Sequence, residues 1–229
     1  MAAETLRGIR ACVFDAYGTL FDLNSATALC LGELGPKADP LNRLWREKQL
    51  QYTWLRTAQQ RHADFWQVTG DALDYALASL AIPRAALWQK LMDSYLALGT
   101  FTEVPAVLQQ LKVAGFKLAI LSNGTPAMLL AAVEHSHLHG LFDTVLSVEQ
   151  AGCYKPHPRV YALATENLKL PAGQIAFVSS NAWDAYAASA FGMRVIWCNR
   201  TRQQAEILPG KPDFEVQSLT AIPALISDQ

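Results

Sequence analysis

Five short apolar runs, separated by long helical segments, constrain the fold of this chain more than any other feature of its sequence. Each run is almost continuously hydrophobic, which is typical of strands buried on both faces of a parallel sheet. The runs are IRACVFD (9–15), FKLAILSN (116–123), DTVLSV (143–148), QIAFVSSN (174–181) and MRVIWCN (193–199). Helical patterns lie between the later runs, so the order predicts an α/β fold with a doubly wound, Rossmann-like parallel sheet.

The interval from Asp15 to Phe116 is too long for a single crossover helix. Within it, three segments repeat apolar residues at steps of three and four, which indicates amphipathic helices. These segments are residues 41–56, 62–80 and 84–99. We therefore predict a core domain made of residues 1–20 and 99–229, with residues 21–98 inserted as a helical-bundle cap domain over the sheet.

The composition narrows the classes of partner. The chain has 229 residues, of which 51% are hydrophobic and 17% charged, and its formal net charge is −1. We expect no nucleic-acid or membrane partner, because there is no basic stripe and no apolar stretch approaching the ~20 residues that a spanning helix needs. Four cysteines, at positions 12, 30, 153 and 198, form no CxxC pair. Reduced, buried thiols and a cytoplasmic location are the expectation.

Polar side chains gather where the predicted strands end. Open α/β sheets bind ligands beyond the carboxyl ends of their strands, so residues at these positions meet at one edge. The ends carry Asp15 and Thr19, then Ser122 and Asn123, then Lys155, and finally Ser179, Asn181 and Asp184. Each residue alone has an ordinary interpretation as a helix or turn cap. Together, two carboxylates, a lysine and several hydroxyl and amide groups indicate an active site.

Four of these segments resemble the sequence motifs of the haloacid dehalogenase superfamily. They are Asp15-Ala-Tyr-Gly-Thr-Leu, Leu-Ser122-Asn, Tyr154-Lys155-Pro and Ser179-Ser-Asn-Ala-Trp-Asp184. More narrowly, LWREKQLQYTWLR and FVSSNAWDA are similar to the type II L-2-haloacid dehalogenases. The resemblance covers nearly the whole chain. It implies hydrolysis of short (S)-2-haloalkanoic acids to (R)-2-hydroxy acids and halide through an aspartyl ester.

Tyr17 stands where the phosphatases of this superfamily have a second aspartate. In those enzymes that aspartate protonates the leaving alcohol, and its backbone helps to hold magnesium. A phenol with an ordinary pKa of ~10 is a poor acid at neutral pH and a poor ligand for a hard cation. A halide leaving group needs no proton, and Asp184 has no adjacent acidic residue with which to enclose Mg²⁺. We therefore expect chemistry without a metal and without any other cofactor.

The resemblance also implies a role for each residue at the sheet edge. Asp15, ionised at neutral pH, attacks C2 of the substrate from behind the carbon–halogen bond. Lys155 balances its charge, and Asp184 orients or deprotonates the water that later hydrolyses the ester. The remaining members of the predicted catalytic set are Thr19, Ser179, Asn181 and Arg46.

An anionic substrate needs donors for its carboxylate and for the departing halide. Ser122, Asn123 and backbone N–H groups near Tyr17 are expected at the carboxylate. Arg46 matches the halide-side arginine of the dehalogenases, although its polar neighbours in WREKQ also fit a solvated arginine. The other residues expected to contact the substrate are Phe65, Tyr161 and Trp183. Glu47 departs from the family pattern, and if it faces the pocket, its charge opposes an anionic substrate.

Two other functions remain open. A magnesium-dependent phosphatase is disfavoured by Tyr17, and a non-catalytic carboxylate binder is disfavoured by the joint presence of Asp15, Lys155 and Asp184. TWLRTAQQRHADFW holds more large apolar residues than a small bundle buries. Because the family that the chain resembles pairs through its cap, we expect a homodimer; the alternative is that these residues fill the core of the insertion.

Overall fold

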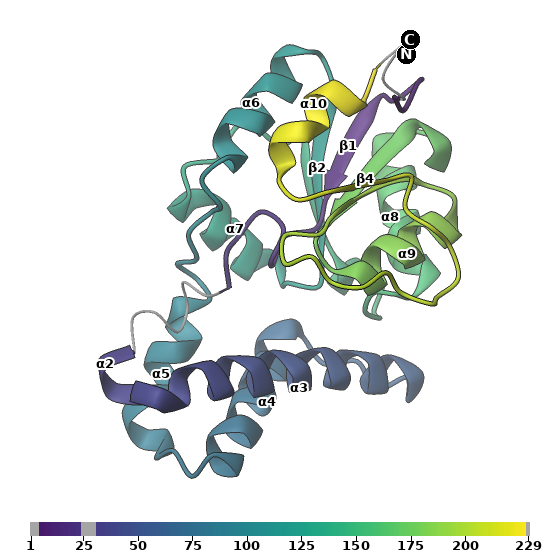
Figure 1. Ribbon diagram of the computed structural model, residues 1–229. Helices are drawn as coiled ribbons and strands as arrows, with labels where there is room; N and C mark the ends of the chain where they lie inside the picture. The colour runs from purple at the N-terminus through teal and green to yellow at the C-terminus, as the bar shows by residue number, and fades with distance from the viewer. Residues whose placement is uncertain (1–4, 24–30, 228–229) are drawn as a thin grey trace.

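The computed structural model describes residues 5–23 and 31–227. In this part of the chain, six strands form one parallel sheet in the order β3-β2-β1-β4-β5-β6 (Figure 1). The strands are β1 (Ala11–Phe14), β2 (Lys117–Ser122), β3 (Thr144–Ser147), β4 (Ile175–Ser179), β5 (Arg194–Cys198) and β6 (Phe214–Val216). The predicted α/β class and the first five strands are confirmed. The sixth strand was not predicted, because its three residues are neither continuously apolar nor buried.

β1 lies at the point where the strand order reverses. From β1 the chain moves outward through β2 and β3, then returns to the other side of β1 and continues through β4, β5 and β6. Phe14, the last residue of β1, pairs with Ile120 on one side and with Val178 on the other, so β2 and β4 extend slightly beyond it. The sheet thus opens a crevice for a ligand directly beyond the last residue of β1.

Helices cover both faces of the sheet (Figure 1). They are α6 (Val104–Val113), α7 (Pro126–His135), α8 (Pro158–Leu168), α9 (Ala182–Phe191) and α10 (Ile222–Leu225). α6 packs against β2 and α10, whereas α9 packs against β4 and β5. Local sequence sets their ends: Thr125 caps α7 by accepting a hydrogen bond from Met128, and α9 stops at Gly192, whose φ is +103°.

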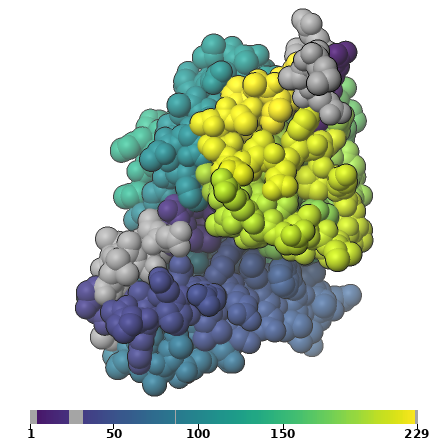
Figure 2. Space-filling view, in the orientation of Figure 1, coloured from purple at the N-terminus to yellow at the C-terminus, as the bar shows by residue number. Residues whose placement is uncertain are grey.

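A second group of helices lies beyond the carboxyl ends of the strands (Figure 1). It comprises α2 (Leu31–Leu34), α3 (Ala38–Ala58), α4 (Phe65–Ser79) and α5 (Arg84–Ser94). α3 buries Leu41, Trp45, Gln49 and Thr53, one residue per turn, and this stripe packs against α4. In the space-filling view these helices, in blue, lie directly against the yellow and green C-terminal part of the chain (Figure 2). All four helices fall within the predicted insertion.

The cysteines that the structure describes are buried in the core domain. Cys12, Cys153 and Cys198 are buried free thiols, as predicted, whereas Cys30 lies outside the described residues. No helix in residues 5–23 and 31–227 is long and apolar enough to cross a membrane.

Candidate active site

The carboxylate of Asp15 lies just past the end of β1 and is surrounded by hydrogen-bond donors. Its Oδ2 accepts from Asn181 Nδ2 at 2.7 Å, Thr19 Oγ1 at 3.1 Å and Ser179 Oγ at 3.3 Å. Its Oδ1 accepts from Lys155 Nζ at 3.1 Å. Only 5% of the residue is exposed, so protein groups replace most of the water that would otherwise solvate its charge. The sequence therefore predicted correctly that these five residues lie together.

Lys155 joins the two buried carboxylates of the site. Its ammonium lies 3.1 Å from Asp15 and 2.8 Å from Oδ2 of Asp184, and its side chain is 1% exposed. Burial alone would lower the pKa of Lys155, but the charges of the two aspartates and the hydrogen bonds to them together outweigh it and raise the pKa above its ordinary value. Lys155 is therefore an ammonium ion at neutral pH. Its backbone is held as well, because Lys155 N donates to Asn123 Oδ1 at 3.1 Å.

Asp184, in the first turn of α9, is fully buried and has two partners. Lys155 contacts Oδ2, and the Tyr161 hydroxyl donates to Oδ1 at 2.7 Å. Burial raises the pKa of Asp184, while Lys155 and Tyr161 favour its charged form. Because both carboxylate oxygens lie within hydrogen-bond range of these donors, we take the ion pair with Lys155 as the state at neutral pH. Tyr161, predicted to contact the substrate, thus reaches the site through Asp184.

Tyr17 and Phe65 form an aromatic wall between the core and the insertion. Their rings stack with centroids 5.8 Å apart, and the ring of Tyr95 lies 6.0 Å from that of Tyr17. Burial raises the pKa of Tyr17, so its phenol is neutral, and its buried hydroxyl has no hydrogen-bond partner among the described residues. A Cβ at Gly124 would lie 2.8 Å from that hydroxyl, so the loop after β2 approaches Tyr17 closely only because Gly124 has no side chain.

Arg46 on α3 contacts Asn181 on the side of the site, and on the other side it is held by two buried polar side chains of the insertion. Its Nη2 lies 3.5 Å from Asn181 Oδ1, and its Nη1 donates to Gln49 Oε1 at 2.7 Å. Gln49 in turn donates to Thr69 Oγ1 at 2.7 Å. Gln49 and Thr69 were not predicted from the sequence, although a polar residue on the apolar face of an amphipathic helix is a usable signal. Glu47 is exposed and does not line the cavity that Arg46 lines.

Ser122 and Asn123 lie at the end of β2, nearly or fully buried. The Ser122 hydroxyl accepts from Gly124 N at 3.2 Å, and Asn123 Oδ1 accepts from Lys155 N. These contacts fix the loop that borders Asp15 and Lys155. Their predicted contact with a substrate carboxylate remains a prediction.

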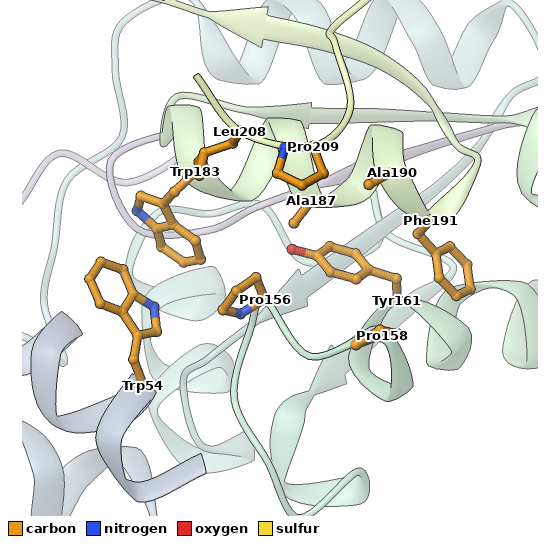
Figure 3. A pocket seen from close by; sticks show the side chains of 10 residues that line it. All are labelled: Trp54, Pro156, Pro158, Tyr161, Trp183, Ala187, Ala190, Phe191, Leu208 and Pro209. Atoms are coloured by element: carbon orange, nitrogen blue, oxygen red, sulfur yellow. The ribbon is translucent and has the colours of Figure 1, made fainter. Parts of the chain in front are cut away.

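Trp183, also predicted to contact the substrate, lines a different cavity from the one that Arg46 and Asn181 line. Its indole faces Trp54 of α3, with ring centroids 5.5 Å apart at 79° (Figure 3). It lines an apolar cavity of about 300 Å³ together with Tyr161 and Pro156. Trp183 comes one residue before Asp184 on α9, and successive helical residues point about 100° apart. Because Asp184 faces inward to Lys155, Trp183 is turned toward the insertion.

A larger and more polar cavity, of about 460 Å³, opens between the insertion and the core. Arg46 and Asn181 line it, and Asn181 also donates to Asp15, so the cavity adjoins the group around Asp15. Its other charged residues are Arg43, Arg200, Asp22 and Asp39. In residues 5–23 and 31–227, no group of three or more His, Cys, Asp or Glu side chains is arranged to hold a metal ion.

The arrangement suits attack by a carboxylate on an electrophilic carbon. Asp15 is held in place by neutral donors and one ammonium ion, and one of those donors, Asn181, lines a cavity large enough for a small acid. The guanidinium of Arg46, next to Asn181, provides positive charge for an anion in that cavity.

Comparisons with known proteins show the family to which the chain belongs. A family model described as haloacid dehalogenase-like hydrolase matches residues 9–192. The (S)-2-haloacid dehalogenase of Pseudomonas sp. (strain YL) is 45% identical over 215 residues, which cover 93% of this chain and 93% of that protein. The (S)-2-haloacid dehalogenase 1 of Pseudomonas sp. (strain CBS-3) is 42% identical, with 95% and 96% covered.

Solved structures of dehalogenases are also similar to this chain over nearly its whole length. A dehalogenase with an intermediate complex superposes with a TM-score of 0.94 at 40% identity, covering 96% of this chain and 98% of that one. The L-2-haloacid dehalogenase from Xanthobacter autotrophicus with chloropropionic acid covalently bound gives a TM-score of 0.89 at 36% identity, with 95% and 98% covered.

Proposed function

We propose, starting from the fact that this chain belongs to the haloacid dehalogenase-like hydrolase family, that it hydrolyses short (S)-2-haloalkanoic acids to (R)-2-hydroxy acids and halide. The observation that carries the proposal is the setting of Asp15, a buried carboxylate with donors on both oxygens at the end of β1. The similarity to a dehalogenase with chloropropionic acid covalently bound supports the same chemistry.

In the first step, an oxygen of Asp15 attacks C2 of the substrate from the side opposite the halogen. The new carbon–oxygen bond forms as the carbon–halogen bond breaks, and the halide leaves with the electron pair. Holding both reactants in line replaces an effective molarity of ~10⁵ M or more. Arg46 and Asn181, which are neighbours in the cavity, stabilise the departing halide, and the ring of Phe65 forms an apolar side to the site.

In the second step, water attacks the carbonyl carbon of the Asp15 ester. The acyl–oxygen bond breaks, the 2-hydroxy acid takes one proton of the water, and Asp15 is regenerated as the carboxylate with release of the other proton. The single displacement at C2 inverts its configuration, so an S substrate gives an R product. Asp184 orients the water, and the ammonium of Lys155 balances the charge of Asp184 while Asp15 is esterified and contacts Asp15 again once its carboxylate is regenerated.

The reaction that we propose needs no metal and no other cofactor. The ammonium of Lys155 contacts both Asp15 and Asp184, so a divalent cation binding to these two carboxylates would be repelled by a buried positive charge. Tyr17 offers a neutral phenol where a metal-dependent phosphatase offers a carboxylate.

The test is halide release from each enantiomer of 2-chloropropionate with a chelator present, recording the chirality of the lactate formed. We expect release from the S enantiomer only, giving (R)-lactate, and none from the Asp15→Asn variant. Single turnover in ¹⁸O-labelled water should place the isotope in Asp15. Phosphate release from a phosphomonoester that needs Mg²⁺ would favour a phosphatase, and carboxylate binding without turnover would favour a binding protein.

We also propose that two copies of the chain pair through the insertion. Three large apolar side chains are exposed there: Trp54 (39%) and Leu55 (48%) on α3, and Tyr75 (44%) on α4. A paired face would remove them from water. Small-angle scattering should give twice the chain mass of 25.2 kDa, and Leu55→Glu should shift the protein toward the monomer. A monomer at every concentration would refute the pairing.

A further inference from the structure

The two linkers that join the insertion to the core cross side by side. The chain leaves the core after Leu20 and returns at Gly99, and the linkers are hydrogen-bonded to each other. Asp22 N donates to Gly99 O at 2.8 Å, and Phe101 N donates to Leu20 O at 3.2 Å. Any movement of the insertion relative to the sheet must act through this pair of segments.

Arg200, which follows β5, contacts both linkers at once. Its Nη2 donates to the backbone carbonyl of Thr19 at 3.0 Å, just before the outgoing linker. Its Cζ lies 3.7 Å from the centroid of the Phe101 ring on the return linker, and its Nη1 donates to Glu103 Oε1 at 2.6 Å. The Arg200 side chain is only 16% exposed.

The carbonyl that Arg200 holds belongs to a residue of the nucleophile's environment. The Thr19 hydroxyl donates to Asp15 Oδ2 at 3.1 Å and accepts from Ser180 N at 2.8 Å. Thr19 therefore connects the loop after β1 with the loop after β4. A shift of its backbone would change the geometry of the Asp15 carboxylate.

We propose that Arg200 is a positioning residue that clamps both linkers and so fixes Thr19, and through it the carboxylate of Asp15. The planar guanidinium suits this role, because it stacks on Phe101 while its two terminal nitrogens point to Thr19 and Glu103. A lysine at position 200 would keep the charge, but it would lose the stacking on Phe101 and could not donate to Thr19 and Glu103 in the same way. The link to turnover depends on the dehalogenase function proposed above; the clamp itself does not.

Glu103 anchors the clamp on the core side. It stands at the start of α6 and also accepts a hydrogen bond from the Ser218 hydroxyl at 3.3 Å. Burial disfavours the charge of Glu103, but the hydrogen bond from Arg200, backbone N–H groups and the charge of Arg200 together outweigh it, so the pKa of Glu103 is below its ordinary value. The anchor is thus a carboxylate at neutral pH.

The experiment compares Arg200→Lys with Arg194→Lys in the full-length protein. Arg194 begins β5, at the opposite edge of the sheet, and forms an ion pair with Asp213 at 2.7 Å. Its replacement therefore disturbs another arginine–carboxylate ion pair, more exposed than that of Arg200, without touching either linker. Hydrogen–deuterium exchange at the amides of Asp22 and Phe101 measures the clamp, and kcat for halide release measures its effect on the chemistry.

We expect faster exchange at both linker amides in Arg200→Lys, a fall in kcat of about ten- to a hundredfold, and a smaller change in KM. Arg194→Lys should leave both readings at the wild-type level, even if its thermal midpoint falls equally. Glu103→Gln should show the linker effect in weaker form, since Arg200 keeps its contacts with Thr19 and Phe101.

Two results would overturn the proposal. Unchanged linker exchange in Arg200→Lys would show that there is no clamp, and loosened linkers with wild-type kcat would show that the clamp does not position the nucleophile. If the wild-type protein released no halide at all, the proposed function would fail, and linker exchange would still decide whether Arg200 clamps the linkers.

Discussion

Arg46 donates a hydrogen bond of 2.7 Å to the side chain of Gln49, one turn further along α3. Gln49 is fully buried and is itself fixed by Thr69 on α4, so the direction of the Arg46 guanidinium is set by the packing of two helices. A surface arginine would instead sample many rotamers. The cation that we propose for the departing halide is thus held in place before a substrate binds.

Gln49→Leu should therefore reduce dehalogenation without unfolding the protein. A hydrogen bond to a charged group contributes about 1.5–3 kcal/mol, so we expect kcat/KM to fall roughly 10- to 100-fold. Gln51→Leu is the matched control, because Gln51 is exposed and accepts from Lys48 on the outer face of the same helix. Wild-type kcat/KM in Gln49→Leu would show that Arg46 needs no support.

Removal of the Lys155 ammonium should abolish turnover and destabilise the fold. Lys155→Met leaves Asp15 and Asp184 buried without their shared cation, and breaking a buried pair costs about 3–5 kcal/mol. The pKa of Lys155 is raised above 10.5 in the folded state. Its stabilisation is therefore complete below pH 10.5 and is lost as the pH rises through the folded pKa.

Urea unfolding at a series of pH values measures how the stabilisation by Lys155 depends on pH. The difference in unfolding free energy between wild type and Lys155→Met should be largest near neutral pH and should shrink above pH 10.5. A difference that instead grew on the alkaline side would contradict the assignment of Lys155 as the buried ammonium.

Tyr161→Phe should slow ester hydrolysis more than ester formation. It removes the hydroxyl that donates to Asp184 Oδ1 at 2.7 Å, so the pKa of Asp184, already raised by burial, should rise further. Because Asp184 serves the second step in our mechanism, rapid-quench measurements should show a burst of halide followed by turnover about tenfold slower. Tyr186→Phe is the control, since that ring packs against Trp197. Equal slowing of ester formation and ester hydrolysis would contradict the proposal that Asp184 acts in the hydrolysis step.

Gly124→Ala should strain the aromatic wall of the site. The added Cβ would lie 2.8 Å from the hydroxyl oxygen of Tyr17 and 3.1 Å from Leu129. Overpacking of this kind costs about 1–3 kcal/mol, which thermal unfolding would detect, and the displaced ring should raise KM. Gly173→Ala should have little effect, because a Cβ there meets no atom within 4 Å.

The sheet and most of the nucleophile's surroundings could be predicted from the sequence. Strands buried on both faces are continuous apolar runs, and parallel strands bring their carboxyl ends to one edge. These two rules predict that Asp15, Lys155 and Asp184 lie together, as they do. Arg46 needed a family resemblance, because its polar neighbours on α3 are those of a solvated arginine.

What could not be predicted depends on packing between distant segments. β6 is too short and too exposed to have a strand pattern of its own, and it forms because β5 offers a free edge. The direction of Trp183 depends on Trp54, more than 100 residues earlier, and the role of Gln49 depends on Thr69. The residues next to Trp183 and Gln49 in the sequence do not predict which distant residues they contact.

The position of β1 inside the sheet has a consequence for how activity is lost on heating. β1 is bonded to β2 on one side and to β4 on the other, so it belongs to the part of a protein that opens last. Warming short of the melting transition therefore leaves Asp15, our proposed nucleophile, in place at the end of β1. Early, reversible inactivation should start in the helices that lie over it, and cooling should restore turnover as soon as they return.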